Sequence, residues 1–378
     1  MNKIEIRSVH NNEELEEVYE LWGNVFPEDK SFFQERLELE EDYDYNTTWI
    51  AIVNGKIAAA VQIFPYFITF EKAVLKVGGI GNVATLPDYR GMSLTQTILK
   101  RQSEWMKSNG FDLSLLFTGI NPFYEKIGWQ TFPIYSQILR KSPEIPSFNY
   151  EITEFSNGDL EEIKSLYQVY CGKFVGSRIR SSTYWEAQLS KSSNFLIAKD
   201  ENEVVAYLRY RCIEGNIMID ECCHDEGYEN AVLSLLKETL VRNKSFDSIR
   251  MTFASNHVLS HYFQECDAEK IVETTNMWKI IDFNRLIEKL RDVFTNRIYS
   301  DVKENTILFQ CGNSDILFTI KEGVVDIKIP GDSFAYNELV KVNEGKFISM
   351  LLEGIEGEEP LKDIFPKVHY NFWGTDSF

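Results

Sequence analysis

One segment in the first third of the chain constrains the fold most, because it combines the signals of a strand, a tight turn and a helix. Residues 77–86 are apolar and rich in glycine and β-branched side chains, and Pro87 ends this extended stretch. Residues 94–108 carry apolar side chains at helical spacing, and Asn109 with Gly110 is a typical helix C-cap. The sequence therefore predicts a strand, a turn and a helix in immediate succession.

The turn between this strand and this helix is suited to binding an anion. Ser93 is a candidate N-cap of the helix, whose first N–H groups lack partners within the helix and whose dipole favours negative charge. Arg90 lies beside them, so we expect a group such as a pyrophosphate at this turn. Residues 79–84 also match the GxGxxA dinucleotide pattern, but that pattern must open a helix, whereas here a proline ends an extended stretch. We therefore exclude a dinucleotide-binding turn.

A second motif follows the helix and, with the first, carries a family resemblance. Residues 113–117 read as a strand, and Asn121 and the run Tyr-Glu-Lys-Ile-Gly-Trp at 124–129 come after it. Together with the turn they resemble the GNAT N-acetyltransferase superfamily, whose acetyl-CoA loop corresponds to residues 90–95. Ser and Thr stand at 93 and 95, where that family prefers Gly or Ala. The resemblance implies acetyl-CoA as co-substrate, bound by Val83, Ala84, Arg90, Gly91, Met92, Ser93, Leu94, Thr95 and Asn121.

The hairpin signal of the first unit recurs later in the chain. Asn54-Gly55 lies between two apolar runs within residues 48–65 and predicts a two-residue hairpin, and residues 194–210 again place two apolar runs around a polar turn. The proline-containing stretch 141–147 between them reads as a linker, so we infer an internal duplication. Residues 194–282 resemble a second GNAT unit, in which the acidic run at 224–227 replaces the basic loop and would repel phosphate.

The second unit also contains residue types that bind metals. His257, His261 and Glu265 share one face of a predicted helix, but they recur where the duplication places a structural helix. Residues 220–224 include Asp, two Cys and His, yet side chains adjacent in a strand point to opposite faces. We therefore expect no metal site.

The predicted order of helices and strands changes after residue 282. The pattern predicts a helix at 284–295, strands at 306–311, 316–321 and 324–329, and helices at 333–341 and 346–353. The whole chain resembles the Eis-type (enhanced intracellular survival) acetyltransferases, which implies an α/β (α+β) fold of two tandem GNAT-type mixed-sheet domains followed by a sterol-carrier-protein-like α+β domain. The expected bounds are 1–142 for the catalytic domain, 149–283 for the degenerate second domain and 284–378 for the third.

The same resemblance implies two catalytic groups. Tyr124 matches the catalytic Tyr that protonates the departing CoA thiolate, and the terminal carboxylate, here on Phe378, enters the active site as the base. A base is needed because an ammonium acceptor must lose a proton before it attacks a thioester. Residues 77–86 contain no carboxylate, and the aromatic terminus 372–378 is better suited to a groove than to a free tail. The candidate walls of the amine pocket are Trp22, Phe26, Phe32, Phe33, Glu35 and Glu38.

Charge and hydropathy limit the classes of partner and the cellular location that we expect. The net charge of −19, with 58 acidic and 39 basic residues, argues against nucleic acid and anionic membranes as partners. The chain begins without a secretory signal pattern and has no apolar stretch of about 18 residues, so we expect a cytoplasmic protein. The six Cys residues show no CxxC, which is consistent with a reducing compartment. Eis-type relatives form hexamers, so the resemblance implies a homo-oligomer, for example a hexamer.

Two hypotheses of function follow from these patterns. The first is an acetyl-CoA-dependent N-acetyltransferase that acts directly on a primary amine, such as a polyamine-like compound, an aminoglycoside or a lysine side chain. The alternative is a catalytically degenerate GNAT scaffold that binds acyl-CoA or a lipid-like ligand, which the residues at 93 and 95 and the missing strand carboxylate favour. Deletion of residues 372–378 discriminates between them, because the enzyme would lose turnover and the binding protein would keep its ligand.

Overall fold

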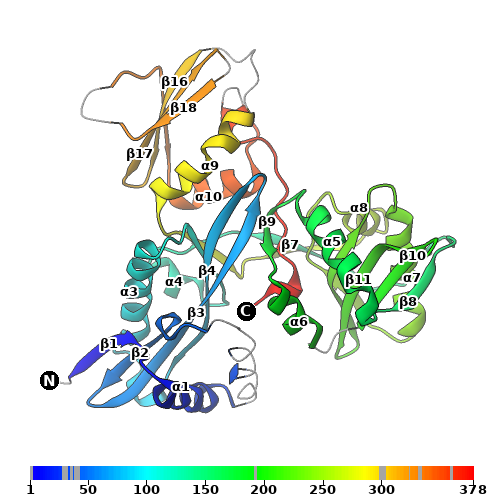
Figure 1. Ribbon diagram of the computed structural model, residues 1–378, viewed down its shortest axis with the longest axis horizontal. Coiled ribbons are helices and arrows are strands. Elements are labelled where there is room, and N and C mark those ends of the chain that lie inside the picture. The colour runs from blue at the N-terminus through cyan, green and yellow to red at the C-terminus, as the bar shows by residue number, and fades with distance from the viewer. Residues whose placement is uncertain are drawn as a thin grey trace.

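The computed structural model describes residues 3–27, 33–34, 37, 43–190, 194–297, 304–322, 324–330, 334–357 and 361–378. They form three mixed sheets of eight, seven and four strands, each with its own helices (Figure 1). We call these sheets, with their helices, the first, second and third units. In Figure 1 the first unit lies at the lower left, the second at the right and the third at the top, and the chain ends between the first two.

The first unit is built around the predicted hairpin. Asn54 and Gly55 have φ values of 52° and 87°, which is the two-residue turn that the sequence predicts. The strand order is β1-β2-β3-β4-β5-β15-β6, with β9 paired to β3. The elements are β1 (Ile4–Ser8), α1 (Asn12–Val25), β2 (Thr48–Val53), β3 (Lys56–Phe70), β4 (Ala73–Thr85), α3 (Leu94–Ser108), β5 (Leu113–Phe117), α4 (Asn121–Glu125), β6 (Gln130–Thr131), β9 (Val175–Ile179) and β15 (Asn276–Ile280), with short 3-10 turns at Tyr45–Thr47 and Pro87–Tyr89.

The second unit has the strand order β14-β7-β13-β12-β11-β10-β8. Its β10–β11 pair confirms the second predicted hairpin. The elements are β7 (Ile134–Leu139), β8 (Glu151–Glu154), α5 (Leu160–Cys171), α6 (Ser182–Ser190), β10 (Asn194–Asp200), β11 (Glu203–Ile213), β12 (Asn216–His224), α7 (Glu229–Arg242), β13 (Ser248–Met251), α8 (Val258–Glu265) and β14 (Glu269–Glu273), with a 3-10 turn at Asn157–Asp159.

The two large sheets share a feature that matters for the site. In the first, β4 pairs with β5 in parallel over residues 77–80 and 113–116, and in the second, β12 pairs with β13 in parallel over residues 216–219 and 248–251. The sheets also exchange strands, because β7 joins the second sheet and β15 joins the first. The predicted domain bounds, which follow the chain, stay a prediction.

The third unit contacts the far end of the β3–β4 hairpin. Tyr66, Ile68 and Phe70 of β3 share one hydrophobic core with α9 and with the four-stranded sheet. The predicted helix at 333–341 is wrong over residues 338–341, which belong to strand β19 (Glu338–Val342), parallel to β16, because Val340 and Val342 pack against that core from an extended chain. The elements are α9 (Phe283–Arg297), β16 (Asn305–Cys311), β17 (Ser314–Lys321), β18 (Val324–Lys328), β19 (Glu338–Val342), α10 (Glu344–Glu353), α11 (Leu361–Ile364) and a 3-10 turn, η5 (Gly374–Asp376).

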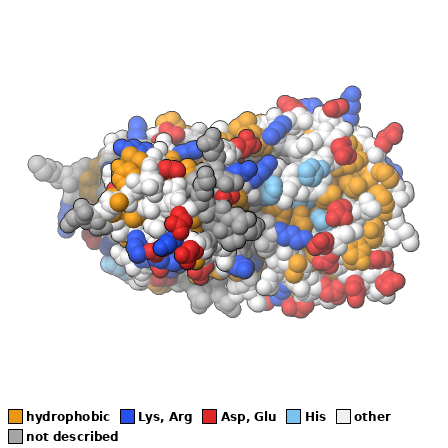
Figure 2. Space-filling view, turned by 90° about the horizontal axis from the view of Figure 1, so that it is seen from above, with side chains coloured by type: hydrophobic (Ala, Val, Ile, Leu, Met, Phe, Trp, Pro, Cys, Tyr) orange, Lys and Arg blue, Asp and Glu red, His pale blue; other side chains and the backbone are white. Residues whose placement is uncertain are grey.

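Acidic and basic side chains are interspersed on the face shown in Figure 2. The six cysteines are free thiols, of which Cys171, Cys222, Cys223 and Cys311 are buried. Of the helices that the structure describes, none combines the length and the apolar character that a bilayer crossing demands.

Candidate active site

The first unit contains an opening between two neighbouring strands. β4 pairs with β5 only as far as Ile80 and Leu116, and beyond this point residues 81–85 have no strand partner on that side within the described ranges. On its other side the register with β3 shifts, so that Gln62 faces Gly81 whereas Ala60 faces Ala84. Asn82 has a φ of 51°, so residues 82–83 form a β-bulge. The backbone of β4 at Val83 and Ala84 therefore lies where β4 and β5 no longer pair, and we call this gap in the strand pairing the slot.

The turn that follows β4 has the local form that the sequence predicts, with one correction. Helix α3 covers the expected residues 94–108. Ser93 occupies the N-cap position, but its φ is 56° and its side chain makes no capping bond, so the predicted side-chain cap is wrong. A left-handed backbone moves its hydroxyl away from the first-turn N–H groups.

Those N–H groups therefore remain unpaired at the start of α3, beside an exposed Arg90 that has no ion-pair partner in the part of the chain described. Gly91, with a φ of 82°, has open space around its Cα. Thr95 turns its hydroxyl back to Thr85 at 2.6 Å, so this larger residue does not point its side-chain oxygen into the turn. Ser93 adopts the backbone conformation that glycine would adopt there.

Tyr124 lies on α4, directly after β5. Its side chain is 6% exposed and contacts the rings of Phe123 and Trp129 edge-on, at centroid distances of 4.9 and 6.5 Å. No described residue makes a hydrogen bond with its hydroxyl, and burial raises the pKa of Tyr124 to about 12. The hydroxyl therefore keeps its proton at neutral pH and can donate it.

The C-terminal Phe378 docks against the first sheet. Its ring packs on Phe117, Phe64 and Tyr66 at centroid distances of 5.3, 5.7 and 5.8 Å. A Cβ at Gly79 would lie 2.6 Å from the nearest ring carbon of Phe378, so only glycine admits the ring at this contact. The first glycine of the GxG pattern thus accommodates the chain's own terminus.

The slot separates two groups of the predicted residues. Tyr124 shares a hydrophobic cluster with Leu94, against which Val83 and Met92 pack. Ala84 belongs to a different cluster, against which Phe378 packs. Because Val83 and Ala84 are neighbours on β4 yet join different clusters, the two catalytic candidates lie on opposite faces of this strand.

The remaining predicted residues have mixed positions. Asn121 donates both amide hydrogens within the protein, to Thr131 Oγ1 at 2.8 Å and to the carbonyl of Thr274 at 2.7 Å. Trp22 is fully buried and Phe33 is 5% exposed, and both belong to the cluster that Phe378 contacts. Phe26 is 37% exposed and lies 5.8 Å from Phe33 between ring centroids. Phe32, Glu35 and Glu38 lie outside the described residues.

The second unit has the same parallel strand pair, but its opening is occupied by the chain itself. Trp373 is fully buried there, 5.0 Å from the ring of Phe253, and donates from Nε1 to Sγ of Cys171 at 3.1 Å. His257 is also buried, and its ring bonds the carbonyl of Cys222 and the amide of Leu259. Burial lowers the pKa of His257 to about 3. Over the ranges that the structure describes, no group of three or more metal-ligand residues forms a candidate metal site.

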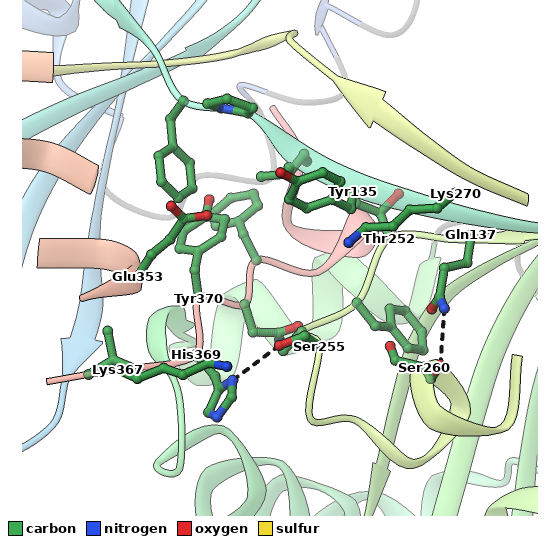
Figure 3. Close-up of a pocket in the computed structure, with 18 of the residues that line it drawn as sticks. Tyr135, Gln137, Thr252, Ser255, Ser260, Lys270, Glu353, Lys367, His369 and Tyr370 are labelled. Atoms are coloured by element: carbon green, nitrogen blue, oxygen red, sulfur yellow. Dashed lines mark hydrogen bonds between the residues drawn. The ribbon is translucent and has the colours of Figure 1, made fainter. Parts of the chain in front are cut away.

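A cavity of about 500 Å³ lies apart from the predicted site residues (Figure 3). It is bordered by β7, by the segment after β13 and by residues 367–372 of the tail. Ser255 and His369 meet across it at 3.3 Å, and Gln137 donates to the carbonyl of Ser260 at 3.0 Å. None of the predicted site residues within the described chain lines it, so it is separate from the slot.

Comparison with known proteins identifies the first unit. Residues 5–132 match the model of the acetyltransferase (GNAT) domain. This range contains the slot, the turn, α3 and Tyr124. The chain therefore contains an acyltransferase domain of the GNAT type within these residues. No curated protein matches the sequence.

Solved structures share the fold over the whole chain. A probable N-acyltransferase from Enterococcus faecalis has a TM-score of 0.77 at 17% identity, and a GCN5-related N-acetyltransferase from Anabaena variabilis has 0.76 at 13%. Eis1 from Mycobacterium abscessus has a TM-score of 0.66 at 13% identity. Each comparison covers 100% of this chain and 100% of the other. At these identities the likeness establishes the fold, and it is consistent with the expected tandem α/β arrangement.

Proposed function

We propose that the acyltransferase domain of residues 5–132 transfers an acetyl group from acetyl-CoA directly to a primary amine. The observation that carries this proposal is the slot along β4, with Tyr124 on one face of the strand and the docked C-terminus on the other. A direct transfer needs a thioester held between an acid for the leaving group and a base for the attacking group. The slot supplies one candidate on each side.

The residues around the slot are suited to acetyl-CoA. The free N–H groups at the start of α3, with Arg90 beside them, would bind the pyrophosphate. Backbone N–H groups near Val83 and Ala84, next to the β-bulge, would hold the pantetheine and polarise the thioester carbonyl. Asn121 has its amide hydrogens engaged within the protein, so it would contact the cofactor through its carbonyl oxygen.

The chemistry needs three proton movements. The acceptor ammonium gives a proton to the carboxylate of Phe378, its nitrogen then forms the new bond to the acetyl carbon, and the same nitrogen loses a second proton to solvent as the amide forms. The carbon–sulfur bond breaks, and Tyr124 donates its proton to the departing thiolate. Because the pKa of Tyr124 is raised to about 12 by burial, the acid is loaded at neutral pH and readily recovers its proton afterwards.

The acceptor is a primary amine of the polyamine, aminoglycoside or lysine type. The net charge of −19 favours the approach of a cation over long range. Trp22, Phe26 and Phe33 are the described candidates for the acceptor walls, because they lie in or beside the cluster that Phe378 contacts.

A binding and turnover experiment tests the proposal. Purified protein is titrated with acetyl-CoA by calorimetry, and thiol release is then measured over a panel of polyamines, aminoglycosides and lysine peptides. We expect binding together with amine-dependent release of CoA. Binding without release for any acceptor would favour the degenerate scaffold, and the absence of acetyl-CoA binding would contradict the assignment of the turn.

A further inference from the structure

We propose that Arg180 is a positioning residue and that the second unit acts as a clasp, which holds the tail so that the carboxylate of Phe378 reaches the slot of the first unit. This inference rests on the proposed function, because it assigns a purpose to a tail whose end serves as the base. It also explains why a unit with the same parallel strand pair carries no basic phosphate-binding loop.

The contacts of Arg180 are the first argument. Its guanidinium is fully buried and bonds the carboxylate of Asp376 in the tail, with Nε to Oδ1 at 2.9 Å and Nη2 to Oδ2 at 3.0 Å. On its other side it bonds Glu221 of β12, with Nη1 to Oε1 at 3.0 Å and Nη2 to Oε2 at 2.8 Å. One cation thus joins the second sheet to the tail through paired, charge-assisted bonds.

The residues around Arg180 exclude water from this contact and keep its partners ionised. The guanidinium carbon lies 4.0 Å from the ring centroid of Tyr167 and 4.6 Å from that of Trp185. Burial opposes charge on Glu221, but Arg180 outweighs it and lowers the pKa of Glu221 to about 2. The carboxylates of Glu221 and Asp376 also raise the pKa of Arg180 against the effect of its burial. A buried ion group of this kind favours a single position of the tail. If one partner is removed, the remaining charges are buried without a counter-charge or water, which is strongly destabilising.

The position of the tail in the second unit is the second argument. Beyond residues 219 and 251, strands β12 and β13 no longer pair, as in the first unit. Trp373 is buried against this opening, and a Cβ at Gly374 would lie 2.9 Å from Oδ1 of Asp220. The tail therefore occupies the place that corresponds to the proposed pantetheine slot. The second unit binds a segment of its own chain where the first would bind a coenzyme.

Chain length links the clasp to the base. Asp376 is two residues before Phe378, and two residues span at most about 7 Å. An anchored Asp376 thus confines the terminal carboxylate to a small region, whereas a terminus without tertiary bonds frays. The contact of the Phe378 ring with Gly79 is the second anchor. The terminal residue is therefore held both by its own ring and, two residues earlier, by Asp376.

A protection assay tests the clasp without any acceptor. Carboxypeptidase A is added to the full chain, and release of Phe378 is followed by mass spectrometry. The test variants are Asp376→Asn, which keeps the Arg180–Glu221 pair, and Arg180→Gln. Asp159→Asn is the matched control, because Asp159 is also a low-exposure carboxylate paired with a cation, Lys199 at 2.6 Å, but lies outside the tail. We expect release at least tenfold faster in the test variants and unchanged release in the control.

A pH profile tests positioning of the base. The base matters only while the acceptor is an ammonium, with a pKa of about 10 for a lysine-like amine. We expect Asp376→Asn to lower kcat by about tenfold or more at pH 7 and by less than about threefold near pH 10, with the KM for acetyl-CoA unchanged. A purely structural defect would lower the rate equally at both pH values.

The outcomes separate the two proposals. Unchanged release of Phe378 in folded Asp376→Asn would overturn the clasp, whatever the activity. Faster release with an unchanged pH profile would overturn the positioning role. If the wild-type chain acetylates nothing in the panel, the proposed function fails, while the protection assay still decides whether Arg180 holds the tail. If Arg180→Gln does not fold, Asp376→Asn carries the test.

Discussion

Replacing Gly79 by alanine is the sharpest test of where the terminal residue, Phe378, lies in the fold. The new Cβ would lie 2.6–2.9 Å from three carbons of the Phe378 ring, and these are the three atoms nearest to it. Gly79 does not have a positive φ, so alanine is compatible with the backbone and the closest clash is with Phe378. Non-bonded carbon atoms in proteins do not approach this closely, so the Phe378 ring must move away from Gly79.

The size of the effect has two bounds. Forcing an extra carbon into a packed site costs about 1–3 kcal/mol, and expelling the ring forfeits a similar amount of apolar burial. An energy of about 1–3 kcal/mol corresponds to about a 5- to 150-fold larger population of the undocked tail. We therefore expect Gly79→Ala to speed the release of Phe378 by carboxypeptidase A by that factor, under conditions where docking is faster than cleavage.

The assay has an internal control in the same domain. Gly119 has no neighbouring atom within 4 Å of a built Cβ and no positive φ, so Gly119→Ala should leave the release rate unchanged. The same Gly79→Ala variant should lose most of its acetyl transfer and retain acetyl-CoA binding. A release rate equal to that of the wild type would show that the ring does not lie on Gly79, and the reasoning about the base would be refuted.

Three further predictions rest on other contacts. Tyr124→Phe should lower kcat by about 100-fold or more with acetyl-CoA affinity retained in calorimetry, and an unchanged kcat would refute the acid role. Arg90→Ala should weaken acetyl-CoA binding by about tenfold at low salt, with a smaller loss at high salt, because a charged contact to phosphate is screened. Because the pKa of Glu221 falls from 4.5 to about 2 on folding, its stabilising effect is complete above about pH 5 and is lost as the pH falls toward 2. Release of Phe378 should accelerate over that window, which an acid-tolerant carboxypeptidase can measure, and a flat profile would contradict the pairing.

Local sequence signals predicted much of the first unit. The hairpin at Asn54-Gly55 and the helix over residues 94–108 were predictable, because a two-residue turn, an apolar period and a glycine C-cap each act within a few residues. The same kind of signal misled at residues 333–341. There the pairing of β19 with β16 overrides local preference, since strand pairing depends on a partner far along the chain.

Gly79 is the clearest case in which the sequence pattern was visible but its structural reason was not. The GxG pattern at residues 79–81 stands out in the sequence, and only the structure shows that Gly79 makes room for Phe378, almost 300 positions away. The exchange of β7 and β15 between the two large sheets was likewise hidden, because no local feature of a strand names the sheet it joins.

By itself the sequence determined the strand, turn and helix of the proposed cofactor site, the recurrence of the hairpin and the aromatic character of the tail. The tertiary structure alone decided where that tail lies. Arg180, Glu221 and Asp376 carry no shared motif and are separated by up to 196 positions, yet they form one buried ion group. The physical reason is that helices and turns arise from neighbouring residues, whereas burial of charge depends on which distant chains exclude water together.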